Sequence, residues 1–256
     1  MDLSTIIGIV GGFTVLGIAM FMKPGASFFF KIDAFLIVMG GTLGATLAQY
    51  PMKDFLSVMS VTRKAFLHKA TSVESIIETL VGLSRRARVE GLLSLEKDIA
   101  ELDDAFIKKG LQLMVDGTET EILREILGTE LEYIEERHAL GRDIFNTLAT
   151  YCPAFGMAGT LIGLIQMLQA LSDPSKIGAG MAVAMVTTFY GVVFANLIFM
   201  PIAGKLKQRS KQEVLTKTLV LEGISSIQAG DNPRLLRDKL LTFMPPKDRN
   251  ENIGED

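Results

Sequence analysis

Four stretches of the chain are almost entirely apolar and carry no charged residue. They are 19 to 29 residues long and lie at 3–22, 34–52, 144–172 and 177–204. A bilayer core about 30 Å thick is crossed by roughly 20 apolar helical residues, and a helix satisfies its own backbone hydrogen bonds in lipid. The pattern therefore predicts an all-α membrane protein with four transmembrane helices and excludes a soluble enzyme.

The polar parts of the chain have the periodicity of amphipathic helices. Between the second and third apolar stretches, apolar residues recur at helical spacing, and Gly91 is placed to interrupt this pattern. Thr71 with Glu74, and Thr118 with Glu121, form capping-box patterns at two predicted helix starts. We expect this long connection to be a helical domain rather than a passive linker.

The longest predicted helix runs from the polar connection into the third apolar stretch. No proline occurs between Thr118 and Pro153, so the helix that begins near Thr118 is predicted to continue into the third apolar stretch. In the tail, Asn232 is placed to cap a helix that starts with Pro233. The predicted parts are two transmembrane helices, a cytoplasmic helical domain, two more transmembrane helices and a cytoplasmic helical tail, at 1–52, 53–143, 144–204 and 205–256.

Lysine and arginine near the ends of the apolar stretches predict the orientation, because cationic loops remain in the cytoplasm. The short loops predicted to lie outside hold three of them, Lys23, Lys31 and Lys176. The opposite side holds ten: Lys53, Arg63, Lys64, Arg137, Arg142, Lys205, Lys207, Arg209, Lys211 and Lys217. We therefore expect a multi-pass protein of the inner membrane with both termini and the 53–143 connection in the cytoplasm.

Composition excludes several classes of function. The formal net charge of −3 argues against a nucleic-acid partner, which needs a basic face. The single cysteine, Cys152, leaves no disulfide framework and no cysteine-based metal site. The two histidines, His68 and His138, have no recognised metal spacing. We expect neither an enzyme nor a bound cofactor.

The third and fourth apolar stretches carry the candidate ion path. Pro153 has no N–H, so the carbonyl of Ala149 loses its helical partner. Thr160 follows about two turns later on the same face. In the fourth stretch, Thr188 could supply another oxygen from a small-residue stripe at Gly180, Ala184, Thr188, Gly191 and Ala195. Thr187, about 100° away from that stripe, is the remaining hydroxyl of the candidate path. These oxygens suit a dehydrated hard cation, although small and hydroxyl residues also serve plain helix packing.

The apolar stretches contain no Asp, Glu, Lys, Arg or His. Proton relays and cation carriers in membranes normally use an ionisable group to load and release the ion. This chain therefore supplies neutral ligands only, and a partner protein is expected to supply the carboxylate.

Three motifs carry a resemblance to a known family. They are Pro-Ala-Phe-Gly-Met-Ala-Gly-Thr at 153–160, Met-Ala-Val-Ala-Met-Val-Thr-Thr-Phe-Tyr-Gly at 181–191, and Glu-Gly-Ile-Ser-Ser-Ile-Gln-Ala-Gly-Asp-Asn-Pro-Arg at 222–234. With them, essentially the whole chain resembles the MotA/PomA family, the A subunits of the bacterial flagellar stator.

The resemblance implies a pentameric ring of A subunits around a dimer of a single-span MotB/PomB-type B subunit, whose aspartate binds the ion. Ion flow would turn the ring against the rotor protein FliG. Two rotor-contact positions match Arg88 and Glu96, and the family's two important prolines match Pro153 and Pro174. Without the resemblance, Arg88 and Glu96 would be ordinary solvated helix charges.

The resemblance also bears on the transported ion. Sodium-using members have threonine at the position of Thr160, whereas proton-using members tend to have alanine. We expect sodium, held transiently by Thr160 and Thr188, with the proton as the alternative. The chain departs from the sodium-type pattern at Thr150, where an aspartate is usual, at Tyr151-Cys152, and at Lys31, where an outer acid is usual.

Three alternatives stay open at this point. An ExbB/TolQ-like protein also surrounds a single-span partner, but that class generally has three spans in a different order. A self-sufficient channel or transporter is disfavoured by the missing intramembrane charge. A membrane enzyme is disfavoured because the histidines form no metal or catalytic pattern.

Overall fold

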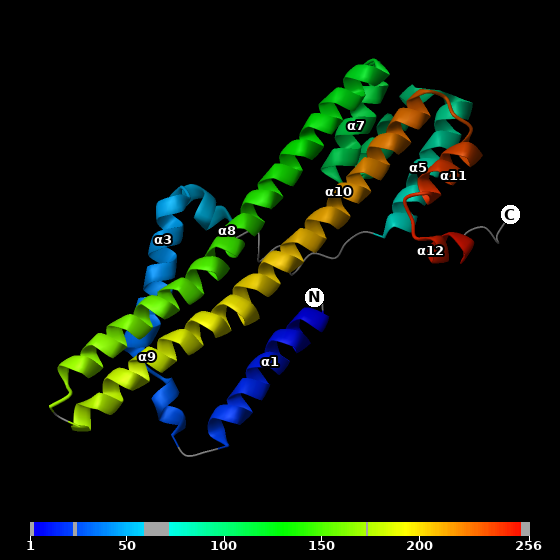
Figure 1. Ribbon diagram of the computed structural model, residues 1–256. Helices are drawn as coiled ribbons and strands as arrows, with labels where there is room; N and C mark the ends of the chain where they lie inside the picture. Colours follow the sequence, from blue (N-terminus) through cyan, green and yellow to red (C-terminus); the bar gives the residue numbers. More distant parts are fainter. Residues whose placement is uncertain (1–2, 23–24, 59–71, 173, 252–256) are drawn as a thin grey trace. The chain divides into compact units, whose positions relative to one another are not determined.

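The computed structural model describes residues 3–22, 25–58, 72–172 and 174–251. Within these ranges every regular element is a helix (Figure 1), which confirms the all-α prediction. Of the residues used above, Lys23, Arg63, Lys64, His68 and Thr71 lie outside the described ranges.

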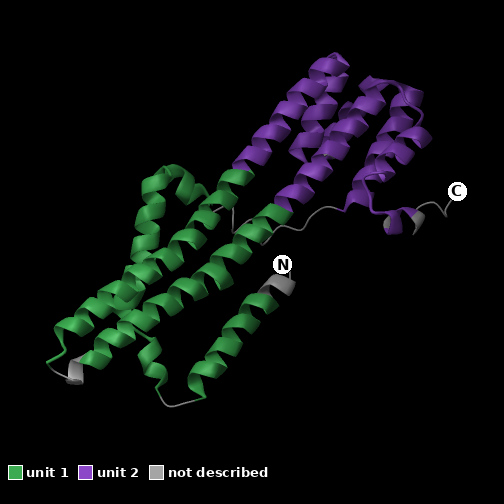
Figure 2. Ribbon diagram, in the orientation of Figure 1, with its two compact units in different colours: residues 1–68, 138–208 green, residues 69–137, 209–256 purple. Residues whose placement is uncertain are grey.

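The chain divides into two compact units (Figure 2). Unit 1 comprises residues 1–68 and 138–208, and unit 2 comprises residues 69–137 and 209–256. The helices of unit 1 are α1 (Leu3–Phe21), η1 (Ala26–Phe29), α2 (Ile32–Phe35), the π-helical turn η2 (Leu36–Gly40), α3 (Gly41–Gln49), part of α8 (Thr120–Gln169), α9 (Pro174–Phe194), the π-helical turn η4 (Ala195–Phe199) and the first part of α10 (Met200–Gln228).

Three helical segments are long and apolar enough to cross a membrane: Ala26–Gln49, Thr120–Gln169 and Ile177–Gln228. The fourth predicted span falls in α1, where the apolar helix Ile7–Phe21 is shorter. By length and composition, the structure supports three spans, and the fourth stays a prediction.

The predicted long helix is confirmed, but its start is not. α8 runs without a break for 50 residues and includes Pro153. It begins at Thr120, two residues after the expected cap at Thr118. The reason is a turn at Gly117, where φ is +77° and the Thr118 N–H bonds 3.1 Å back to the carbonyl of Leu113. Residue 118 therefore closes the preceding helix.

Other predicted helix ends agree better. Gly91 ends α5 (Val73–Glu90) with φ of +87°, a conformation that glycine adopts without steric cost. The side chain of Asn232 accepts the N–H of Arg234 at 3.0 Å at the start of α11 (Pro233–Leu241). The start of α5 is capped by Ser72, whose hydroxyl accepts the N–H of Ser75 at 3.1 Å.

The second span is buried along one whole face. Ala34, Val38, Thr42 and Thr46 follow one another at four-residue spacing and are all fully buried. At Gly41, a Cβ would come 2.2 Å from the Phe155 ring of α8. One face of this span is therefore buried against the protein, and α3 packs closely on α8 at Gly41.

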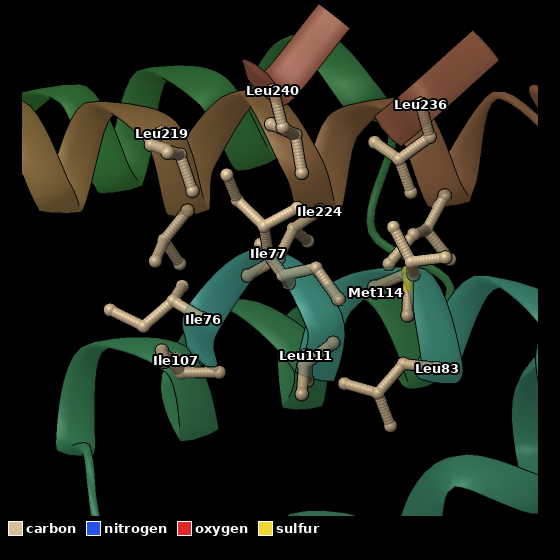
Figure 3. Close-up of a cluster of buried hydrophobic side chains, with 14 of the residues drawn as sticks. Ile76, Ile77, Leu83, Ile107, Leu111, Met114, Leu219, Ile224, Leu236 and Leu240 are labelled. Carbon is tan, nitrogen blue, oxygen red and sulfur yellow. The ribbon is translucent and has the colours of Figure 1, made fainter. Parts of the chain in front are cut away.

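Unit 2 is a small helical domain with its own hydrophobic core (Figure 3). Its helices are α5, η3 (Leu92–Leu95), α6 (Glu96–Glu101), α7 (Ala105–Val115), the start of α8, the end of α10, α11 and α12 (Pro246–Glu251). Core side chains such as Leu80, Leu111 and Ile224 are fully buried. A buried leucine contributes about 1.5–3 kcal/mol, so this core supports an independent packing unit.

An ion cluster joins three helices of unit 2. Both oxygens of the Glu222 carboxylate accept the Arg124 guanidinium, at 3.1 and 3.2 Å, and Lys239 lies 2.9 Å away. Burial raises the pKa of Glu222, but the hydrogen bonds from Lys239 and Arg124 lower it more, so the pKa lies below its ordinary value. The carboxylate is thus held charged between α8, α10 and α11.

Candidate functional site

The helices α8 and α9 touch each other backbone to backbone. A Cβ added to Gly163 would lie 2.6 Å from both the Ala184 nitrogen and the Gly180 carbonyl oxygen. A Cβ added to Gly191 would lie 2.8 Å from the Cys152 carbonyl oxygen. Real Cβ contacts are not this short, so glycine is required at both positions. The small residues of the two helices form a close contact, as such residues do in membranes.

The register of this contact is antiparallel. Gly163 faces Gly180, and further along the pair Gly156 faces Thr187 and Gly191. In one direction along the pair, residue numbers therefore decrease on α8 and increase on α9. This order fixes which threonines lie inside the contact and which lie beside it.

Thr187 lies inside the contact. It is fully buried, and its Cγ2 would lie 2.5 Å from a Cβ on Gly159. Its hydroxyl is 3.0 Å from the Val183 carbonyl and 2.9 Å from the Ala184 carbonyl of its own helix. The small-residue face of α9 therefore passes through Thr187 rather than Thr188 at this level. The geometry favours a packing role for Thr187.

Thr160 and Thr188 lie beside the contact, on the same side. Each follows a contact residue, Gly159 or Thr187, by one position, a rotation of about 100°. In antiparallel helices that face each other, equal rotations move both residues to the same side of the pair. The Thr188 Cα lies 3.4 Å from a Cβ added to Gly156, so Thr188 is level with Gly156. Thr160 follows Gly156 by four residues, so the two threonines are about one turn apart along the axis.

The two side chains remain accessible in the chain. Thr160 is partly buried and Thr188 is exposed. The Thr160 hydroxyl donates to the Met157 carbonyl at 2.6 Å, and that of Thr188 to the Ala184 carbonyl at 3.4 Å. In each hydroxyl the oxygen lone pairs are left to accept or to ligate. This pair can offer two neutral oxygens to a cation.

The other predicted members of the ion path lie apart from this pair. Ala149 is buried and stands 11 residues, or about 16 Å, from Thr160 along α8. The two cannot ligate one ion together. Pro153 touches α9, since its Cα is 3.1 Å from an added Cβ on Gly191. Pro174 is the first residue of α9, where a proline fits without loss of a hydrogen bond.

The unusual residues before Pro153 make contacts within unit 1. Cys152 is fully buried. The Tyr151 hydroxyl donates to the Gln49 side-chain oxygen at 3.0 Å, and the Thr150 hydroxyl donates to the Asn146 carbonyl at 2.9 Å. These residues fix α8 against the end of α3 or bond within their own helix.

Sequence reasoning missed Tyr190. Its hydroxyl donates to the Phe29 carbonyl, and the Lys31 N–H donates to the same hydroxyl at 3.3 Å. Its ring contacts Phe35 and Phe194, with centroids 6.3 and 5.9 Å away. A tyrosine inside an apolar stretch was the available signal, since its hydroxyl needs a partner there.

The two predicted rotor-contact residues lie at one turn of unit 2. Arg88 is in the last turn of α5 and Glu96 is the first residue of α6; both are exposed. Their neighbours Arg86 and Asp98 form an ion pair with each other. Within residues 72–172 and 174–251, no ion pair involves Arg88 or Glu96.

Comparison with known proteins decides the family. The model of the MotA/TolQ/ExbB proton channel family matches residues 98–218. Motility protein A of Borreliella burgdorferi is 42% identical, with 99% of each chain covered. Chemotaxis protein PomA of Vibrio alginolyticus is 37% identical, with 100% of this chain and 100% of the relative covered. The chain belongs to the MotA/TolQ/ExbB proton channel family.

Solved structures agree with this family. A chain of the flagellar MotAB stator complex from Bacillus subtilis has a TM-score of 0.90 and 35% identity, with 98% of both chains covered. A chain of the C. jejuni MotAB structure also has a TM-score of 0.90, at 28% identity, covering 97% of this chain and 98% of that one. The resemblance inferred from the motifs is confirmed.

Membership of an ion-channel family has two consequences. The expectation that the chain is not an enzyme is confirmed, because the family is one of channel proteins. The three long apolar helices are then those of a multi-pass membrane protein. Among the described residues, no group of three or more His, Cys, Asp or Glu is placed to hold a metal ion.

Proposed function

We propose that the chain is the A subunit of a bacterial flagellar stator and that it conducts sodium ions together with a B subunit, turning their flow into torque on the rotor. The names of its relatives and the MotAB structures support the stator assignment.

One observation carries the sodium proposal. Thr160 and Thr188 lie on the same side of the α8–α9 contact, about one turn apart, and neither is fully buried. A sodium ion that loses its hydration shell needs replacement oxygens, whereas a proton can move between a carboxylate and water without them. Two open hydroxyls therefore favour sodium.

A partner completes the site. The stretches 144–172 and 177–204 contain no Asp, Glu, Lys, Arg or His. The single-span B subunit supplies an aspartate opposite the threonines, within a pentamer of A subunits. The complex lies in the inner membrane, with four spans per A subunit and both termini in the cytoplasm.

The movement begins at the prolines. Pro153 removes one hydrogen bond from the middle of α8, and Pro174 starts α9. Ion binding beside Thr160 bends α8 at Pro153, and the continuous helix carries this motion toward the start of α8 in unit 2. The turn with Arg88 and Glu96 then pushes the rotor.

Swimming speed measured against sodium concentration at fixed pH tests the ion choice. We expect speed to saturate with sodium, and Thr160→Ala to raise the half-saturating concentration several-fold while the membrane level of the protein is unchanged. Thr14→Ala is the matched control, because Thr14 is exposed and its hydroxyl donates to the Val10 carbonyl of its own helix. Speed that is unchanged when potassium replaces sodium would reject sodium in favour of the proton.

Reconstitution in vesicles tests the need for a partner. The A subunit alone is expected to conduct no sodium, and the A and B subunits together are expected to conduct it. Full conduction by the A subunit alone would instead identify a self-sufficient channel. Motility that does not depend on the gene would point to an ExbB/TolQ-like role.

A further inference from the structure

The turn between α5 and α6 carries two exposed apolar side chains that no core explains. Val89 is 84% exposed and Leu93 is 72% exposed. Both lie between Arg88 and Glu96 in the sequence, and Gly91 makes the turn between them. Single exposed apolar residues are common on protein surfaces. Two at one turn, between two unpaired opposite charges, require a reason.

Val89 is exposed near the end of α5. It follows the fully buried Leu80 by nine residues, a rotation of about 900°, which places it on the opposite side of the helix. Glu78 and Arg85 lie within about 40° of the same direction. Because Val89 is largely exposed on this side, it does not contribute to the core of unit 2.

Leu93 is presented outward by a tight helical turn. In a 3₁₀ helix, residues three apart share a face. Leu92 and Leu95 of η3 share the face that packs on the core of unit 2, and Leu95 is fully buried. Leu93 and Glu96 consequently share the outer face. The Leu93 side chain and the Glu96 carboxylate therefore lie on the same exposed face.

The turn is held in one shape. The Ser94 N–H and hydroxyl donate to the Gly91 carbonyl at 3.2 and 2.7 Å, and the Gly91 N–H donates to Ala87 at 3.0 Å. The Arg86–Asp98 ion pair joins α5 to α6 across the turn. A surface that is already ordered loses little entropy when it binds.

We propose that Val89 and Leu93 form an apolar anchor at the centre of a protein-binding surface, with Arg88 and Glu96 as its charged rim. The partner is the rotor protein of the function proposed above, on which this inference rests. Its complementary surface has an apolar patch, an acid that meets Arg88 and a base that meets Glu96. Interfaces commonly gain their affinity from such central anchors, whereas rim charges set orientation and association rate.

The charges favour a protein over a lipid surface as the occupant. An anionic membrane surface attracts clusters of lysine and arginine. This turn instead presents Arg88 and Lys97 together with Glu90 and Glu96, all exposed. Charges of both signs can fix the orientation of a protein partner, whereas they are not attracted as a group to an anionic bilayer.

The test uses the full stator complex in cells and in vesicles. Val89→Thr keeps the shape of the side chain and Leu93→Gln keeps its approximate length, so the combined variant removes apolar surface from an exposed turn. Leu235→Gln is the matched control, because Leu235 is 58% exposed on α11 of the same unit. We measure stall torque, sodium conductance and the amount of stator in the membrane.

The anchor predicts at least about a fivefold loss of torque in the combined variant, with conductance and membrane level unchanged and Leu235→Gln normal. Full torque in the combined variant, with torque lost on Arg88→Glu, would overturn the anchor and leave the stator function standing. Full torque in both would reject a rotor contact at this turn. An equal loss in Leu235→Gln would also overturn the anchor, since the effect would not be specific to the turn.

Discussion

The backbone contact between α8 and α9 predicts that a single methyl group at Gly163 separates the two helices. Alanine there would place its Cβ 2.6 Å from two backbone atoms of α9, where ordinary contact begins at 3.4 Å. Both atoms belong to the main chain of Gly180 and Ala184, so no side-chain rotation relieves the overlap. The helices must move apart by about 0.8 Å.

The cost of this separation follows from packing. A gap of about 0.5–1 Å forfeits a quarter to a half of the dispersion attraction at each contact, and overpacking a close interface costs about 1–3 kcal/mol. Gly163→Ala is therefore expected to destabilise the purified protein by about this amount. It would also displace Thr160 from Thr188 and slow sodium-driven swimming.

Gly178→Ala is the matched control. Gly178 also lies on α9, but an added Cβ would have nothing within 4 Å. Replacing a helical glycine by alanine favours the helix by about 1 kcal/mol, so this variant should be as stable as the native protein or more so. Thermal unfolding in detergent gives the comparison. If both variants unfold at the same temperature, the close contact of α8 with α9 is wrong.

Two further predictions concern single side chains. The Thr187 hydroxyl bonds to carbonyls of its own helix, and valine keeps the shape of this side chain. Thr187→Val should therefore leave sodium conductance within about twofold of native, whereas Thr188→Val should lower it several-fold. Equal losses would place Thr187 in the ion path. Glu222 has a lowered pKa, so its charge contributes stability that is fully present above its unfolded pKa and is lost as pH falls through the folded value. Glu222→Gln should therefore weaken the dependence of unfolding temperature on pH below about 4.5, and an unchanged acid dependence would contradict this.

Much of the helical structure was predictable from local signals. The absence of proline between residue 118 and Pro153 predicted a helix that continues into the third span, and α8 runs through that region. Asn232 before Pro233 predicted the start of α11, and Gly91 predicted the end of α5. These signals act within one or two turns of backbone, so no tertiary contact is needed to interpret them.

The errors arose where distant parts of the chain meet. Thr118 has the sequence of a helix cap, but its N–H closes the turn after α7, and its carbonyl accepts the Gln228 side chain. The second span was predicted from its apolar length alone, which does not show that Thr42 and Thr46 are fully buried or that α3 packs on α8 at Gly41. Tyr190 was missed because its partners lie about 160 residues earlier in the chain.

The sequence by itself determined that the chain is helical and membrane-spanning, that its apolar stretches lack a charge, and that Thr160, Thr187 and Thr188 are the hydroxyls available near the candidate path. Only the tertiary structure decided which of them lies inside the α8–α9 contact. Adjacent helical residues differ by about 100°, and both threonines of α9 suit a small-residue face. The register in which Gly156, Gly159 and Gly163 meet α9 buries Thr187 and leaves Thr188 open. That register depends on how the surfaces of two helices fit together, and the periodicity of one helix does not predict it.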